Sequence, residues 1–196
     1  TFLTAARKMY PNEQADFDYS LLDLVSKKYK DISFSHIVFC QGYQALQNPF
    51  FRNDLLIPNK GELVEIECDG LEEEAICLGP VFIQPIGNKR FRVGSSYTPN
   101  EVSTEPTAFQ LTDLQERLNK IIRVPYKVTN HFAGIRPTTG DRKPILGTHS
   151  KYPFMHFFNG LGSKGASLAP LMAREMVSYL ADGIPLLEDL NWNRFE

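Results

Sequence analysis

Three glycines near the C-terminal end of the chain have the spacing of a nucleotide-binding motif. Gly160, Gly162 and Gly165 spell G-x-G-x-x-G within "HFFNGLGSKGASLAP", residues 156–170. A dinucleotide fingerprint also needs a strand before it, a helix after it, and then a second parallel strand that ends in an acid about twenty residues on. The residues that follow the helix here contain no second buried strand. The standard dinucleotide interpretation therefore fails on context.

The segment can still bind a ligand through its backbone, although it is not a dinucleotide fingerprint. A glycine turn that leads into a helix presents unpaired backbone N–H groups and the positive end of the helix dipole. Lys164 adds a formal positive charge. Such a site suits an anion or an electron-rich carbonyl edge, and the alternative is a plain tight turn between a strand and a helix.

Elements at both ends of the chain must position this segment. Residues 1–10 are typical of a helix, and residues 16–24 and 34–42 predict strands, the second of which runs into a sharp turn at Gly42. "FMHFFNG" predicts a strand before the glycines. "SLAPLMAREMVSYLADG" predicts a helix that tolerates Pro170 in its first turn and stops at Gly183.

The middle of the chain is richer in strands. Residues 56–69 predict an alternating strand whose apolar side is Leu63, Val64 and Ile66. Residues 81–86 and 90–94 predict a hairpin with Gly87-Asn88 at its turn.

A helix and two further strands follow the hairpin. A capping-box pattern, Thr112-x-x-Gln115, predicts the helix start. Its apolar residues at helical spacing are expected to be core: Leu111, Leu114, Leu118 and Ile121. "YKVTNHFAGIRPTTGDRKPILG" then predicts a strand, a turn and a short strand.

The composition limits the function classes. The chain has 196 residues, is 42% hydrophobic and carries a formal charge of −2, so a basic nucleic-acid-binding face is not indicated. Three cysteines without metal-type spacing predict no metal site. No apolar run has the length of a membrane span, and we expect a cytoplasmic protein.

Several segments together resemble the FAD-dependent D-amino-acid oxidase and glycine oxidase superfamily. The most specific are "HFAGIRPTTGDRKPILG" and "FFNGLGSKGASLAPLMAREMVSYL". "FLTAARKMY", "HIVFCQG", "IPNKGELVEI" and "VFIQPIGNKRFRVGSSY" are similar to other family segments and occur in the family's order.

The resemblance implies an α/β fold of mixed α+β character. It is a partial FAD-binding Rossmann-like domain (residues 1–52 and 129–196) with an inserted antiparallel-sheet substrate domain (residues 53–128). The family's N-terminal strand with its own G-x-G-x-x-G is missing, so we expect roughly the C-terminal half of the usual enzyme, with the phosphate-binding copy upstream of Thr1.

The resemblance also assigns residue roles. Arg136 matches the arginine that pairs with a substrate carboxylate, for which a planar guanidinium fork is suited. The loop at Gly160–Gly165 would face the N1–C2=O edge of the flavin, where fixed donors stabilise negative charge. Residues 40–42 would lie near the adenosine or pyrophosphate. The expected cofactor-binding residues are Cys40, Gln41, Gly42, Gly134, Gly160, Leu161, Gly162, Ser163, Lys164 and Gly165.

Three departures from the family pattern bear on substrate and cofactor. Phe82 stands where glycine oxidase has a pocket tyrosine, and Ser163 stands where it has a second arginine, which puts a free small amino acid in doubt as substrate. Residues 131–165 contain no cysteine, so FAD is expected to be non-covalent.

Asp141 is expected to bind backbone N–H groups in its turn. His131 and His156 are expected to be packing or hydrogen-bonded residues, not bases.

These observations lead to one main hypothesis and two alternatives. The main one is part of an FAD-dependent oxidoreductase that oxidises a C–N bond of a small-molecule amine or amino acid by hydride transfer to flavin. The alternatives are the oxidase domain of a tRNA-uridine modification enzyme, and a non-enzymatic binding or assembly module. The oligomeric state is left open.

Overall fold

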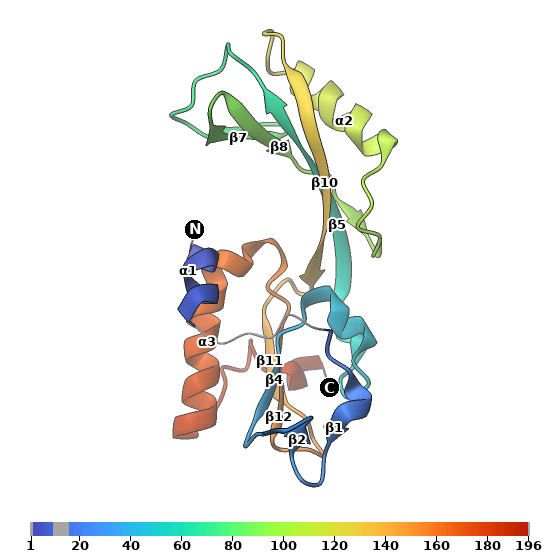
Figure 1. Ribbon diagram of the computed structural model, residues 1–196, viewed down its shortest axis with the longest axis vertical. Helices are drawn as coiled ribbons and strands as arrows, with labels where there is room; N and C mark the ends of the chain where they lie inside the picture. The colour runs from blue at the N-terminus through green and yellow to red at the C-terminus, as the bar shows by residue number, and fades with distance from the viewer. Residues whose placement is uncertain (1, 10–15, 196) are drawn as a thin grey trace. The chain divides into compact units, whose positions relative to one another are not determined.

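The computed structural model describes residues 2–9 and 16–195, which form two compact units (Figure 1). One unit contains the chain up to residue 56 together with residues from 138 onward, and the other contains residues 57–137. The inserted unit was expected at residues 53–128. That the outer unit binds FAD and the inserted unit binds substrate stays a prediction.

The outer unit is built on a three-stranded sheet in the order β11-β12-β4. β4 (Ile37–Phe39) runs parallel to β12 (Met155–Asn159), and β11 (Ile145–Thr148) runs antiparallel to β12. The strands predicted before Gly42 and before the glycine motif are thus neighbours, although β4 is much shorter than the predicted strand.

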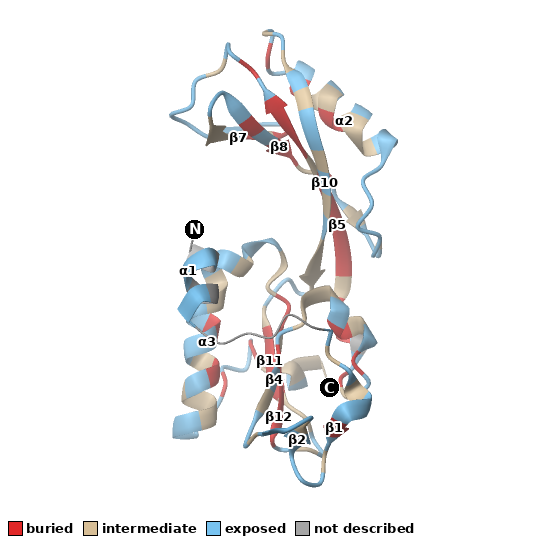
Figure 2. Ribbon diagram, viewed as in Figure 1, coloured by how far each residue is buried: buried red, intermediate tan, exposed pale blue. Residues whose placement is uncertain are grey.

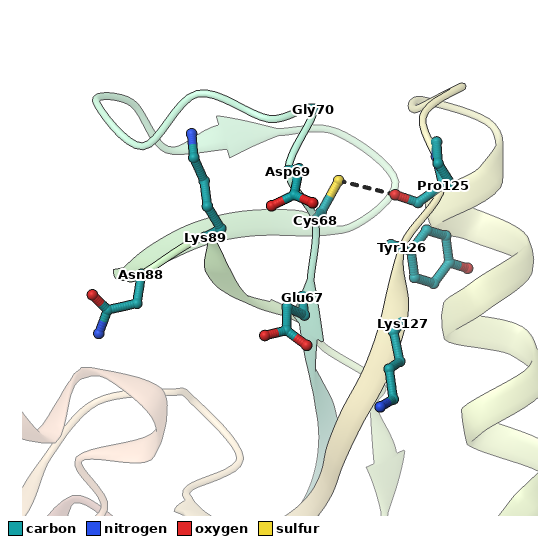
Figure 3. Close-up of a pocket in the computed structure, with 9 residues that line it drawn as sticks. All are labelled: Glu67, Cys68, Asp69, Gly70, Asn88, Lys89, Pro125, Tyr126 and Lys127. Atoms are coloured by element: carbon teal, nitrogen blue, oxygen red, sulfur yellow. Dashed lines mark hydrogen bonds between the residues drawn. The ribbon is translucent and has the colours of Figure 1, made fainter.

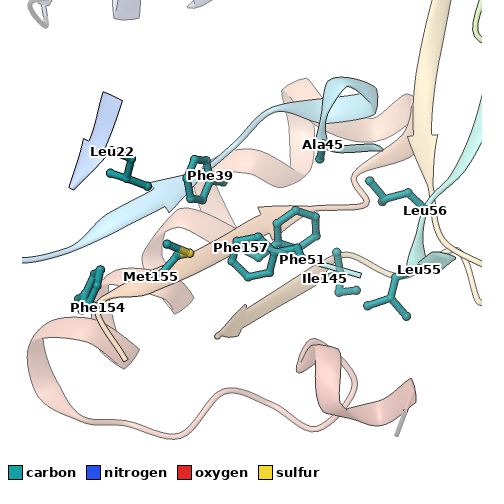
Figure 4. Close-up of a cluster of buried hydrophobic side chains, with 10 residues drawn as sticks. All are labelled: Leu22, Phe39, Ala45, Phe51, Leu55, Leu56, Ile145, Phe154, Met155 and Phe157. Atoms are coloured by element: carbon teal, nitrogen blue, oxygen red, sulfur yellow. The ribbon is translucent and has the colours of Figure 1, made fainter. Parts of the chain in front are cut away.

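Successive residues of this sheet contribute to two different apolar clusters, as the alternation of a strand requires. On one side, Phe157 and Ile145 belong to a cluster rich in aromatic residues from the first third of the chain (Figure 4). On the other side, Leu146 packs with Met172 and Met176 of helix α3 (Gly165–Asp182). The sheet and helix are held together by apolar burial.

Helix α3 confirms the predicted C-terminal helix but begins two residues earlier than expected. Pro170 is therefore the sixth residue of the helix and lies in its second turn, not in the first. Gly183 adopts φ +68° and ends the helix, as predicted, because glycine adopts the left-handed conformation without the steric cost of a Cβ.

The strand prediction for residues 16–24 is largely wrong. Asp18 caps a 3₁₀ helix (Tyr19–Leu21) by accepting a hydrogen bond from the backbone N–H of Ser20, and only β1 (Leu22–Asp23) is extended. β1 pairs with β2 (Lys28–Tyr29), which pairs with β3 (Ile32–Ser33). Local Asp and Ser hydrogen bonds overrode the apolar pattern.

The remaining elements of the outer unit are short. They are α1 (Phe2–Met9) and 3₁₀ helices at Gly42–Gln47, Asn53–Leu55, Gly162–Lys164 and Trp192–Phe195.

The inserted unit is a sheet in the order β10-β5-β8-β7-β6, with β9 also pairing β5. Its long strand β5, which lies between β10 and β8, is almost continuously buried (Figure 2). Strand bounds are Ile57–Glu67 (β5), Cys77–Leu78 (β6), Phe82–Gly87 (β7), Arg90–Gly94 (β8), Thr98–Pro99 (β9) and Lys127–Thr138 (β10).

The β7–β8 hairpin is confirmed, with its turn one residue later than predicted. Asn88 and Lys89 occupy the turn with φ of +57° and +55°, the type I′ pattern that suits the twist of a hairpin. Asn is favourable in that conformation, and Gly87, with φ +89°, lies at the register shift just before the turn.

Helix α2 (Ala108–Asn119) covers one face of this sheet. The N-cap of α2 is Thr107, whose side chain accepts a hydrogen bond from the backbone N–H of Gln110. The predicted cap at Thr112 is therefore wrong. The same T-x-x-Q pattern occurs five residues earlier, at Thr107–Gln110. Leu114 and Leu118 are core as predicted, whereas Ile121 lies beyond the helix and is exposed. Residues 57–137 are all described and contain no second helix.

The alternating pattern of β5 also needs one correction. Val64 and Ile66 pack under α2, but Leu63 points to the opposite face, opposite Gly94 of β8. That face carries the side chain of Arg136.

Among the described helices, none has the length and apolarity needed to cross a membrane.

Candidate functional site

The backbone of the glycine loop after β12 favours glycine at two of its three glycine positions. Gly160 has φ +74° and Gly162 has φ +54°, left-handed values that cost most other residues roughly 1–2 kcal/mol, although Asn88 and Lys89 adopt similar values in the β7–β8 turn. A Cβ on Gly160 would also lie 2.8 Å from Cγ2 of Thr139. Gly165 has ordinary helical angles, and the nearest atom to its Cβ position is 4.0 Å away. The first two glycines serve the turn, and the third does not.

The donors of this loop are backbone groups. The 3₁₀ turn at Gly162–Lys164 is closed by the Lys164 N–H, which donates to Leu161 O at 3.0 Å, and leads directly into α3. No side chain caps either helix start. The first N–H groups of such a start have no partner within the helix. Ser163 and Lys164 are exposed, and Leu161 packs against the α3 cluster.

The loop after β4 lies beside the glycine loop. The buried Asn159 donates from Nδ2 to Gly42 O at 2.8 Å, while its Oδ1 accepts from the Gly160 N–H at 2.9 Å. Both loops follow parallel strands, whose carboxyl ends meet at one edge of a sheet, where open α/β sheets bind ligands. The predicted cofactor residues of the outer unit are therefore brought together. Sequence reasoning missed Asn159. The dipeptide Asn159-Gly160, which is typical of turns, could have indicated it.

The side chains of Cys40 and Gln41 differ in hydrogen bonding and exposure. Gln41 is engaged internally, donating to Tyr19 OH at 2.7 Å and accepting from Asn48 Nδ2 at 2.9 Å. Cys40 is an exposed free thiol. Gly42 has φ +58° and opens the following 3₁₀ helix. Gln41 therefore fixes the shape of this loop with its side chain.

Arg136 lies near the end of β10 in a neutral setting. Its Nη1 donates to Asn59 Oδ1 at 3.0 Å and, at the long limit of 3.4 Å, to Ser96 O; its Nη2 donates to Ser95 Oγ at 2.8 Å. No acid among the described residues forms an ion pair with it. Partial burial lowers the pKa of Arg136, which remains a cation at neutral pH.

Gly61 makes this position available to the guanidinium. A Cβ at residue 61 would lie 2.1 Å from Nη2 of Arg136. Sequence reasoning missed Gly61, Asn59 and Ser95. An isolated glycine inside a strand signals a bulge or a close approach, so Gly61 could have been found.

Two other predicted residues lie in the same sheet. Phe82 pairs with Gly94 across β7 and β8, and its ring lies 3.2 Å from where a Cβ of Gly94 would be. Gly134, two residues before Arg136, is exposed with open space above it. Alternation along β10 puts Phe132, Gly134 and Arg136 on one face.

Asp141 and the two histidines are held by hydrogen bonds or close polar contacts. Asp141 accepts from Thr139 Oγ1, Lys143 N and Arg194, and the Arg194 guanidinium holds the pKa of that carboxyl well below its usual range. His156 is buried between His36 and Thr148, at 2.9 and 2.8 Å. These contacts match the structural roles expected for Asp141 and His156.

His131 belongs to a buried polar cluster under α2. Its Nε2 lies 3.0 Å from Glu62 Oε2, although the N–H is not aligned for a hydrogen bond. Glu62 also accepts from the backbone N–H of Thr107 and lies 3.3 Å from Lys60 Nζ.

A cavity of about 480 Å³ lies at the other end of the inserted sheet (Figure 3). Glu67 at the end of β5 and Lys127 at the start of β10 line it, far along both strands from Asn59 and Arg136. It therefore belongs to neither predicted site. Within the described ranges, no three His, Cys, Asp or Glu residues are grouped to hold a metal ion.

The family model for FAD dependent oxidoreductases matches residues 20–179. This chain belongs to that family. Glycine oxidase from Bacillus subtilis is 26% identical over 147 residues, which cover 71% of this chain and 39% of that protein. The bifunctional protein MnmC of Maricaulis maris, of tRNA 5-methylaminomethyl-2-thiouridine biosynthesis, is 38% identical over 60 residues, which cover 31% of this chain and 10% of that protein.

A solved structure supports the fold. Glycine oxidase from Bacillus cereus superposes with a TM-score of 0.66 at 20% identity, covering 77% of this chain and 43% of that one. The α/β fold with antiparallel sheets is confirmed. The chain spans about two fifths of the length of the glycine oxidases it matches.

The cofactor of the family is FAD. The residues present fit the ring of such a group, because the start of α3 offers backbone donors that no side chain caps.

Proposed function

We propose that the protein to which this chain belongs oxidises a C–N bond of a small amine or amino acid that carries a carboxylate. The observation that supports this most is Arg136, a half-buried cation held by neutral groups only and without an acid partner among the described residues. A guanidinium in that state can form a charge-assisted bidentate pair with a carboxylate.

The chain's own residues would divide the work between recognition and charge stabilisation. Arg136 binds the carboxylate and thereby orients the carbon that is oxidised. Phe82, without a hydroxyl, adds an apolar wall. The backbone N–H groups at Leu161–Gly165 would hold the electron-rich edge of the flavin ring, with residues 40–42 toward its adenosine half. Bound FAD would supply a two-electron acceptor that molecular oxygen reoxidises with release of hydrogen peroxide, and water would hydrolyse the imine product.

Expression of the whole coding sequence tests this proposal. The purified protein should show flavin absorbance, and FAD should be released by denaturation because the attachment is non-covalent. It should form hydrogen peroxide with N-substituted or free amino acids and far less with the corresponding amides, which lack the carboxylate. Absence of flavin, or equal rates with acids and amides, would contradict it.

The oxidase domain of a tRNA-modifying protein is the second candidate. The similarity to MnmC over 60 residues favours it, and the formal charge of −2 opposes it, since RNA binding normally draws on a basic surface. A salt-sensitive gel shift with total tRNA would favour this candidate. Cytoplasmic location remains a prediction.

A further inference from the structure

The contacts of Arg136 raise a question that the proposed function does not answer. An arginine near the end of a strand is commonly paired with an acid, because a carboxylate matches the guanidinium fork. Here the acceptors are the amide oxygen of Asn59, the hydroxyl of Ser95 and a backbone carbonyl at Ser96. All of them are neutral.

The geometry leaves part of the guanidinium unused. Arginine has five N–H donors. The three contacts of Nη1 and Nη2 with described residues occupy three of these donors, so two donors remain for another partner. The positive charge also remains, because neutral acceptors fix the position of the group without neutralising it.

A purely structural role does not explain the burial of Asn59, because burying an amide with an unpaired donor is unfavourable. It is fully buried, and its Nδ2 has no hydrogen-bond partner among the described residues. A buried polar group without a partner calls for an explanation. The amide is oriented by Arg136, since a flipped amide would turn its NH₂ donors toward the guanidinium. Aspartate has the same shape and would have given the ordinary ion pair.

We propose that Asn59 and Ser95 are positioning residues that hold Arg136 through neutral acceptors, which keeps its charge and two of its donors available for a carboxylate ligand. Gly61 supplies the space in which the guanidinium lies. This inference rests on the proposed function, in which Arg136 recognises the carboxylate of the substrate.

The test introduces a competing carboxylate at either positioning residue. Asn59→Asp changes only charge. Ser95→Asp adds a carboxylate on a larger side chain, at a half-buried position where folding is less sensitive. Asn88→Asp is the matched control, because it adds the same charge at the exposed hairpin turn of the same sheet. Acetate is the probe, and acetamide is its neutral counterpart. Binding is followed by broadening of the methyl NMR signal with the protein from the whole coding sequence.

We expect the dissociation constant of acetate to rise about tenfold or more in both variants, because the new carboxylate occupies the charge of Arg136. Acetamide binding should not change, and Asn88→Asp should behave as the wild type. In oxidation assays the KM of an amino acid should rise with kcat nearly constant.

The outcomes separate the two proposals. If the wild type binds acetate and the Asp variants bind it equally well, the positioning role of Asn59 and Ser95 is wrong while the role of Arg136 stands. If equal weakening occurs for acetate and acetamide, the effect is structural and the inference is also wrong. If the wild type does not prefer acetate to acetamide, the carboxylate site itself is wrong, and both proposals fall.

Discussion

Gly61 of β5 lies directly against the guanidinium of Arg136 of β10, so close that a Cβ at residue 61 would be 2.1 Å from Nη2 and 2.2 Å from Nη1. The space left by one missing side chain therefore determines where the charge of Arg136 is held.

Gly61→Ala should displace this guanidinium without changing any charge. We expect kcat/KM for a carboxylate substrate to fall by about 10- to 100-fold, because a charge-assisted contact of roughly 1.5–3 kcal/mol is lost. Steady-state kinetics with an acid and its amide will show it. Gly79→Ala is the control, because the nearest atom to its Cβ would be Cγ2 of Ile121 at 3.8 Å, an ordinary van der Waals contact. Unchanged kinetics for Gly61→Ala would show that Arg136 does not act from this position.

The glycine loop predicts unequal effects at residues 160 and 165. Gly160→Ala should lower the free energy of unfolding by about 2 kcal/mol, because it combines a positive φ with a 2.8 Å contact to Thr139. Gly165→Ala should change it by no more than about 0.5 kcal/mol, since it lies in a regular helix start with room for a methyl group. Urea unfolding compares the two. Equal effects would contradict the assignment of the first glycine to the turn.

We expect a large loss of stability when the charge of Glu62 is removed. Glu62→Gln leaves Lys60, whose side chain is 4% exposed, without a buried counter-ion. We expect the free energy of unfolding to fall by about 3 kcal/mol. Glu116→Gln, on the exposed side of α2, is the control and should change it by less than about 0.5 kcal/mol. A small effect at Glu62 would indicate that water screens this cluster.

The lowered pKa of His156 predicts that the stability of the fold depends on pH. Burial and the neighbouring His36 lower the pKa of His156 to about 4. The unfolded chain, with an ordinary histidine pKa near 6.5, therefore binds a proton more readily than the folded chain between these values. Stability should decline as the pH falls from about 6.5 toward 4, by up to about 3 kcal/mol, and this contribution is fully present only above that range.

His156→Gln should flatten that decline, because glutamine can still donate and accept hydrogen bonds but does not titrate in this range. Burial also lowers the pKa of His149, which adds a decline of the same sign that the variant retains. Chemical denaturation at several pH values measures both slopes. An identical slope in the wild type and the variant would assign the whole effect to other groups.

Local patterns in the sequence predicted most regular elements. Apolar periodicity gave the long helix after the glycine motif and the strands that became β5, β7, β8 and β10. Glycine chemistry gave the end of that helix at Gly183 and the turn at Gly42. Predictions failed where a neighbouring local signal was stronger, as with the Asp18 cap in residues 16–24 and the Thr107 cap.

The surroundings of the site residues were decided only by the tertiary structure. The sequence singled out Arg136 and the glycines by type and position, because residue chemistry and backbone freedom are local properties. It could not indicate that Arg136 would meet Asn59, Ser95 and Ser96, which are 77, 41 and 40 positions away, or that Asn159 would bind Gly42, 117 positions away. Such neighbours depend on how strands pair across the chain. No pattern within a single segment carries that information.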